Sequence, residues 1–102
     1  MRIIKEKFLR EAAEQYPKAA KYLAAWVVTV RAVEWRNMAD VRGYYGSADV
    51  VHVRSGRPVI VFNVCGNTYR LIVAVHFNSQ MAYTLRFLTH AEYDGDDWKD
   101  EL

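Results

Sequence analysis

This 102-residue sequence lacks the features from which disulfides and membrane spans are built. It has one cysteine, Cys65, and a single thiol cannot form an internal disulfide. No apolar run approaches the roughly 18 residues that a membrane-spanning helix needs. The opening residues, Met1 to Lys7, lack the apolar core of a signal peptide. We therefore expect a cytoplasmic protein without a membrane partner.

Acidic residues are missing from Val50 through Ala91. Residues 1–49 hold nine Lys/Arg against six acids (+3), residues 50–91 hold four against none (+4), and residues 92–102 hold one against six (−5). A sheet built from the acid-free span would be basic or neutral and would suit a phosphate ligand. The acidic residues 92–102 are either solvated or lie against that sheet.

The composition, 52% hydrophobic and 14% aromatic, favours one packed domain over residues 1–102. Apolar positions at helical spacing predict a helix from Lys5 to about Tyr16. Pro17 interrupts it and can begin a second helix, roughly Lys18 to Val33, with an inward face of Ala20, Leu23, Ala24, Val27, Val28 and Arg31. Arg2 to Ile4 is either a short strand or a lead-in to the first helix. The helical part is expected at 5–46.

Strand patterns dominate residues 48–88, and a helical turn with the acidic tail is expected at 89–102. The predicted strands are Val50 to Val53, Pro58 to Val64, Tyr69 to Phe77 and Met81 to Leu88. Their short connections favour an antiparallel meander. The sequence thus predicts an α+β fold, a compact antiparallel sheet with two N-terminal helices packed on one side.

Alternation along the last two strands predicts an arginine pair on the solvated face of the sheet. Arg70 and His76 share one face of their strand, and Arg86 shares a face of the next strand with Ala82, Thr84 and Leu88. If the polar faces align, Arg70 and Arg86 converge as a clamp for a phosphodiester. The alternative is that both are solvated surface arginines.

Two sequence blocks carry a family resemblance: Phe62-Asn63-Val64-Cys65-Gly66-Asn67-Thr68-Tyr69-Arg70-Leu71 and Thr89-His90-Ala91-Glu92-Tyr93-Asp94. With these blocks in this order, the chain resembles the HigB family of bacterial type II toxins. The resemblance implies a RelE-like fold and mRNA interferase activity, commonly on messages being translated on the ribosome. It also implies a HigA antitoxin with a helix-turn-helix domain, and contact with DNA only through the antitoxin complex.

The residues offer the groups that metal-free RNA cleavage needs, namely a base, an acid and cations around the phosphate. His90 is the best acid or base candidate, because imidazole titrates near neutral pH. By the resemblance, Arg70 matches the arginine that faces the scissile phosphate, and strand geometry adds Arg86. Tyr93 could stack on a base or donate its hydroxyl. Thr89 and Glu92, at capping-box spacing, should start a helix at His90.

The chain departs from the RelE relatives, which use lysines of the sheet as acid and base. No lysine occurs between Lys21 and Lys99, so that pair cannot be carried over intact. The asparagines of the first block either bind RNA or stabilise its turn. The predicted RNA-binding residues are Asn63, Asn67, Arg54 and Arg57.

Neither a metal nor another cofactor is expected, because the three histidines show no metal-ligand spacing. Two further classes of function stay open. A non-catalytic RNA- or ribosome-binding module would use the same arginines and aromatic residues without needing His90. A protein-interaction domain would need the basic face only for an acidic partner.

Overall fold

In the computed structural model, which describes residues 1–102, five strands form one sheet in the order β1-β5-β4-β3-β2. The strands are β1 (Arg2–Ile4), β2 (Asp49–His52), β3 (Pro58–Val64), β4 (Tyr69–His76) and β5 (Met81–Thr89). Strands β2 to β5 form the expected antiparallel meander. β1 is a true strand that pairs in parallel with β5, so the sheet is mixed rather than purely antiparallel.

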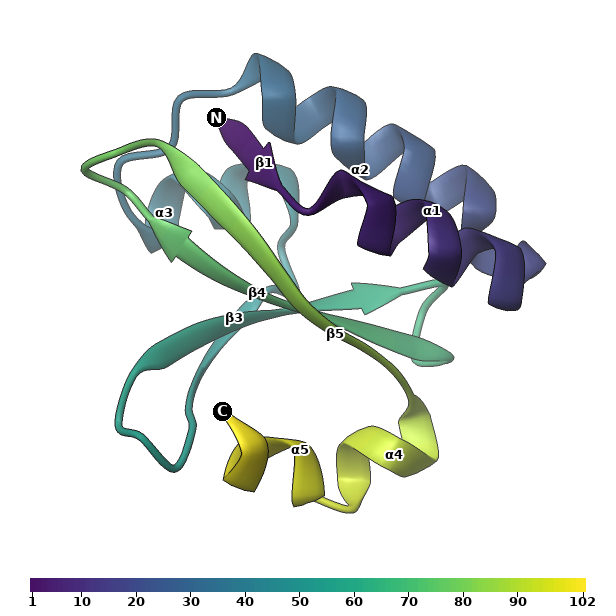
Figure 1. Ribbon diagram of the computed structural model, residues 1–102. Coiled ribbons are helices and arrows are strands. Elements are labelled where there is room, and N and C mark those ends of the chain that lie inside the picture. The colour runs from purple at the N-terminus through teal and green to yellow at the C-terminus, as the bar shows by residue number, and fades with distance from the viewer.

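Helices cover both faces of this sheet (Figure 1). One face, here the first face, carries α1 (Glu6–Gln15), the 3-10 turn η1 (Pro17–Ala19), α2 (Ala20–Ala32) and α3 (Met38–Tyr44). The opposite, second face carries α4 (His90–Asp94) and α5 (Asp97–Glu101). The α+β prediction, with two N-terminal helices on one side, is therefore confirmed. None of these helices combines the length and the apolar character that crossing a membrane requires.

The main core lies between the first face and the N-terminal helices. From α2 it takes Leu23, Trp26 and Val30. Trp26 packs edge-on against Phe62 of β3, with ring centroids 5.5 Å apart. The predicted inward face of α2 was wrong in part, because Val28 is 68% exposed. α2 is apolar nearly all round, so the spacing of its apolar residues alone could not predict that the side carrying Trp26 is the buried one.

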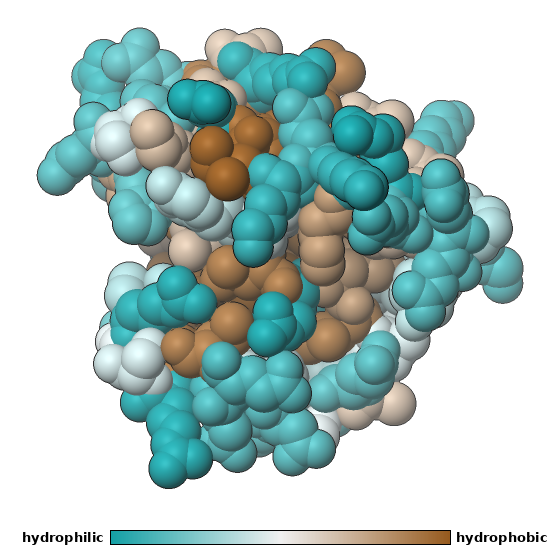
Figure 2. Space-filling view, viewed as in Figure 1, coloured by the Kyte–Doolittle hydropathy of each residue, from teal (hydrophilic) through white to brown (hydrophobic).

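A smaller core on the second face brings residues 92–102 against the sheet. Trp98 of α5 is buried among apolar side chains of the strands and the β2–β3 turn, namely Val53, Val59, Val61, Ile72 and Leu88. Its Nε1 donates to the backbone oxygen of Tyr93 at 3.0 Å. Of the two possibilities for this acidic stretch, the structure shows the one in which it lies on the sheet. Figure 2 shows an apolar band that stays visible across the middle of the molecule.

A β-bulge in β5 breaks the simple alternation of its side chains. Arg86 pairs with Ile72 and Thr84 pairs with Val73, so Leu85 is an extra residue without a partner on β4. A bulge of this kind re-aims the side chains on one side of it.

The bulge separates residues that the sequence had placed together. Arg86 stays on the second face, whereas Thr84 and Ala82 turn to the first face. The Oγ1 of Thr84 donates there to the backbone oxygens of Ile4 and Lys5, at 3.2 and 3.1 Å. The prediction that Arg86 shares its face with Ala82 and Thr84 was therefore wrong.

The start of α4 is fixed by the predicted capping box. The Oγ1 of Thr89 accepts from the backbone N–H of Glu92 at 3.2 Å, and Glu92 accepts from the backbone N–H of Thr89 at 2.9 Å. We expect Thr89→Ala to lower the free energy of unfolding by about 1 kcal/mol, because an orphan N–H loses its acceptor. Urea denaturation measures this. Thr68→Ala, which removes an exposed hydroxyl in a turn, is the matched control. Equal losses of unfolding free energy in both variants would show that the capping box does not stabilise the protein.

Candidate active site

Arg70 lies on the second face of the sheet but is buried, with only 8% of its surface exposed. Its Nη1 donates to the backbone oxygen of Tyr69 at 3.1 Å, and its Nη2 donates to Oδ1 of Asn67 at 3.4 Å. The ring of Tyr93 covers the guanidinium, with its centroid 5.3 Å from Cζ. The expectation of a solvated arginine was wrong, because α4 covers this end of the sheet.

Both predicted asparagines lie beside Arg70. Asn63 is its cross-strand partner on β3 and is half-buried. Asn67 belongs to the β3–β4 turn, where Cys65 and Gly66 have φ angles of 53° and 67°. The hydrogen bond from Arg70 gives Asn67 a further role beyond the turn, because the amide oxygen fixes the orientation of the guanidinium.

His90 opens α4 at the same end of the sheet. Its backbone N–H donates to the oxygen of Thr68 at 3.1 Å, and Leu88, two residues earlier, is the register partner of Arg70. Its Nε2 lies 3.2 Å from Oδ2 of Asp94, and the imidazole is about half exposed. A carboxylate in this position orients the ring and leaves Nδ1 open to a ligand.

Three polar side chains share one side of α4, because positions i, i+3 and i+4 of a helix are neighbours. They are His90, Tyr93 and Asp94. Tyr93 lies over Arg70 and also stacks on Trp98, with centroids 5.4 Å apart and planes 20° from parallel. The guanidinium, phenol, imidazole and carboxylate are therefore gathered around the first turn of α4.

Arg86 shares the second face with Arg70 as its diagonal neighbour. Arg70 pairs with Leu88 and Arg86 with Ile72, so the two arginines lie on the same face, the condition on which the predicted clamp depended. However, the guanidinium of Arg86 is already occupied. Its Nη1 donates to the backbone oxygen of Leu85 at 2.7 Å, and its Nη2 lies 3.2 Å from Oε2 of Glu101.

A cavity of about 400 Å³ between β5 and the two C-terminal helices has Arg86 on its wall. Glu92, Asp97 and Glu101 also line it. Carboxylates repel a phosphate, so this cavity does not suit one while residues 92–102 stay in place. Arg86 can meet an anion only after Glu101 moves away.

Arg54 and Arg57 lie away from this cluster. They are exposed in the turn before β3, whereas Asn63 is near the other end of that strand, about 20 Å along it. The backbone N–H of Arg54 donates to the oxygen of Lys99 at 3.0 Å, which ties the turn to α5. The structure thus divides the predicted RNA-binding residues into two groups at opposite ends of β3.

The other titratable groups offer no metal site, and two tyrosines among them have raised pKa values. No three His, Cys, Asp or Glu side chains gather as metal ligands do. Burial raises the pKa of the Tyr22 phenol far above its usual value, with Tyr45 and then Cys65 adding to the effect. Burial also raises the pKa of Tyr45, against a hydrogen bond with Thr29. Both phenols therefore stay protonated at neutral pH.

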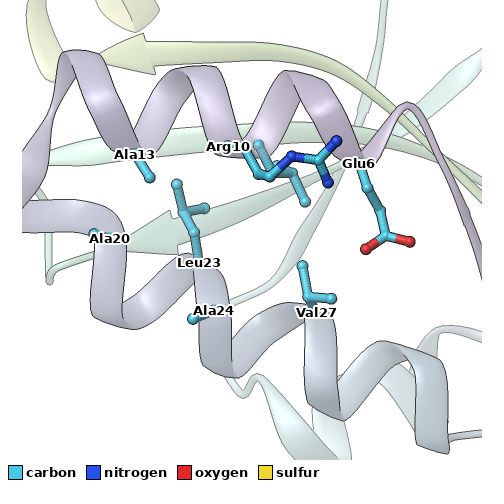
Figure 3. Close-up of a pocket in the computed structure, with 8 residues that line it drawn as sticks. Glu6, Arg10, Ala13, Ala20, Leu23, Ala24 and Val27 are labelled. Carbon is cyan, nitrogen blue, oxygen red and sulfur yellow. The ribbon is translucent and has the colours of Figure 1, made fainter.

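A groove between α1 and α2 is small and mostly apolar (Figure 3), with a volume of about 130 Å³. Its lining residues include Leu9, Leu23 and Val27. Glu6 lies on its edge, but that carboxylate is bound by Nη2 of Arg31 at 2.6 Å. The groove lies among the helices of the first face and holds no group free to transfer a proton.

Comparison with known families decides how the cluster around α4 is understood. Residues 19–96 match the HigB toxin family, described as the RelE-like toxic component of a toxin-antitoxin system. The chain belongs to the HigB toxin family. The family's RelE-like character fits the observed α+β fold, and membership implies an antitoxin partner.

Curated relatives match this HigB-family chain over nearly its whole length. The mRNA interferase toxin HigB of Escherichia coli (strain K12) is 33% identical over 94 residues, covering 92% of this chain and 88% of the relative. The mRNA interferase HigB of Shigella flexneri gives the same identity and coverage.

Sequence reasoning about this HigB-family toxin missed two features of the site. The first is the contact between His90 and Asp94, which their spacing of four on a helix with a clear start could have revealed. The second is the cover that Tyr93, stacked on Trp98, places over Arg70. No local pattern marks that contact, because it depends on how residues 92–102 fold back onto the sheet.

Proposed function

We propose that this HigB-family toxin is a metal-independent endoribonuclease that cleaves mRNA on translating ribosomes. One observation carries the proposal. Arg70, which Asn67 orients, and His90, which is partly exposed and paired with Asp94, lie at the same end of two strands that contain no acidic residue. The mRNA interferase names of its relatives support the same substrate. Arg70 and His90 are the central residues of the proposed site.

The proposed reaction is an internal transesterification of RNA. A base takes the proton of a 2′-hydroxyl, and the 2′-oxygen attacks the adjacent phosphorus. The bond from phosphorus to the 5′-oxygen then breaks, and an acid protonates that oxygen. The products are a 2′,3′-cyclic phosphate and a 5′-hydroxyl. His90 performs one of these proton transfers, because an imidazole exchanges protons near neutral pH. Tyr93 is the candidate for the other, and Asp94 positions the imidazole.

Arg70 stabilises the charge that builds up on the phosphate oxygens. Two of its five N–H donors are used by Tyr69 and Asn67, which leaves donors for the substrate. Because Tyr93 covers the guanidinium, the ring must move aside and can then stack on a base. Arg86 joins the clamp once phosphate has displaced Glu101.

The proposed partners follow from this activity. The chain would act in the cytoplasm, where translating ribosomes present mRNA, and a HigA-type helix-turn-helix antitoxin would silence it. DNA would be contacted only indirectly, through that antitoxin. Arg54, Arg57 and Asn63 are the proposed contacts to RNA outside the reacting phosphate.

Expression in bacterial cells tests the proposal. Induction of the chain should stop growth and shorten cellular mRNA, and co-expression of a HigA-type antitoxin should restore both. The His90→Gln variant separates the two RNA-directed candidates. Growth arrest by that variant with intact mRNA would favour the non-catalytic ribosome-binding module.

A further inference from the structure

The half of the second face that α4 and α5 leave uncovered carries an aromatic pair. The ring of His76, on β4, lies 5.0 Å from the ring of Tyr83, on β5, with planes tilted by 59°. His76 is exposed and Tyr83 is half-exposed. Neither residue belongs to the site around α4, and neither is part of the main core.

The β-bulge is what places Tyr83 on this face. Without the extra residue Leu85, strict alternation would send Tyr83 and Arg86 to opposite faces. With it, Arg86 pairs with Ile72 and Tyr83 pairs with Ala74, and all four point to the second face. Bulges are frequent beside active sites, where they re-aim a side chain. As a result, Arg86 and Tyr83 follow one another along the same face of β5.

The surroundings of the aromatic pair favour an anionic polymer. A cavity of about 450 Å³ opens beside His76 and is lined by Arg57, Asn78 and Ser79 but by no acidic side chain. The nearest stretch of sequence is equally free of acids, from Val50 through Ala91. A cationic group, two hydrogen-bonding side chains and an aromatic platform are the components of single-stranded nucleic acid sites.

We propose that His76 and Tyr83 form a base-stacking subsite for an RNA nucleotide a few positions from the one that is cleaved, with Arg57 holding its phosphate. The inference rests on the proposed function and deepens it. Along β4, His76 lies about 20 Å from Arg70 on the same face, a distance of a few nucleotides. α5 covers the face between these two places, where Arg86 pairs with Glu101. RNA bound at Arg70 therefore passes Arg86 and reaches the aromatic pair once α5 has moved aside.

The subsite makes Tyr83 and His76 specificity-determining residues rather than catalytic ones. Loss of stacking weakens the binding of RNA and leaves the proton transfers at His90 intact. We expect Tyr83→Leu to lower the cleavage rate about tenfold at limiting mRNA. The loss should shrink at saturating mRNA, and the base preference a few nucleotides from the cut should broaden. Tyr83→Phe, which keeps a ring, should behave like the parent protein.

The experiment adds purified protein to a translation extract and maps the cut ends of a reporter mRNA by sequencing. Tyr44→Leu, an exposed tyrosine on α3 at the opposite side of the sheet, is the matched control and should change neither rate nor positions. His76→Gln repeats the test at an exposed residue, where folding is not at risk. Thermal melting verifies that each variant is folded.

Three outcomes decide between the possibilities. The subsite is supported if Tyr83→Leu and His76→Gln cleave mRNA more slowly and less selectively than the parent protein while Tyr44→Leu cleaves like the parent. Folded variants that cut the parental positions at the parental rate refute the subsite and leave the proposed function standing. An intact reporter mRNA with the parent protein refutes the proposed function and the subsite together.

Discussion

Replacing Arg70 with lysine is expected to lower the rate of mRNA cleavage by about a hundredfold or more, because the negative charge of the transition state loses a fixed hydrogen-bond donor. Lysine keeps the positive charge but lacks the planar set of donors that fits phosphate oxygens. It also cannot bridge the Tyr69 oxygen and Asn67 as the guanidinium does. The measurement is the rate of cleavage of a reporter mRNA in a translation extract.

Lysine is a better substitution here than alanine. Arg70 is buried beneath Tyr93, so alanine would open a cavity and leave the Asn67 oxygen without its donor. A loss of activity could then come from a loss of folding. Arg36→Lys, at an exposed position before α3, is the matched control and should cleave like the parent. If Arg70→Lys remains folded and cleaves as fast as Arg36→Lys, the planar donors of Arg70 have no part in the reaction.

His90→Gln is expected to reduce cleavage by about a hundredfold or more while binding to ribosomes or RNA stays within a few fold. Glutamine keeps approximate size and hydrogen bonding but cannot exchange protons near neutral pH. The half-exposed side chain contributes little to packing, so stability should hold. Single-turnover cleavage and sedimentation with ribosomes measure the two quantities separately.

Two companion variants sharpen this test. His52→Gln changes an exposed histidine on β2 and should leave the rate unchanged. Asp94→Asn removes the charge that orients His90 and should cause a smaller loss than His90→Gln, because the imidazole itself remains. Full activity in His90→Gln would show that the imidazole has only a structural role in the first turn of α4. Tyr93 or water would then transfer the proton.

The strands and the start of α4 could be predicted because their signals are local. Alternating β-branched residues with turns between them gave the four-strand meander, and the spacing of Thr89 and Glu92 gave the capping box. The shared face of Arg70 and Arg86 was stated only as a condition, because the register of two strands is not written in either one, and the structure fulfils it. The family resemblance extended this to the fold class and to the toxin family.

The rest depended on contacts between distant segments. The burial of Arg70 follows from the packing of Tyr93 and Trp98, which lie far along the chain from β4. The bulge at Leu85 has no distinctive residue, so alternation misplaced Ala82 and Thr84. That the acidic stretch lies on the sheet was one of two options, and its pairing of Glu101 with Arg86 was not predicted.

The most direct test of the proposed activity is to add purified protein to a translation extract and map new 5′ ends in a reporter mRNA. We expect the parent protein to produce internal ends that carry a 5′-hydroxyl. Arg70→Lys and His90→Gln should produce almost none, although both remain folded and bind ribosomes. Translation that stops while the reporter mRNA stays full-length would contradict the account, and so would equal cleavage by the parent and both variants.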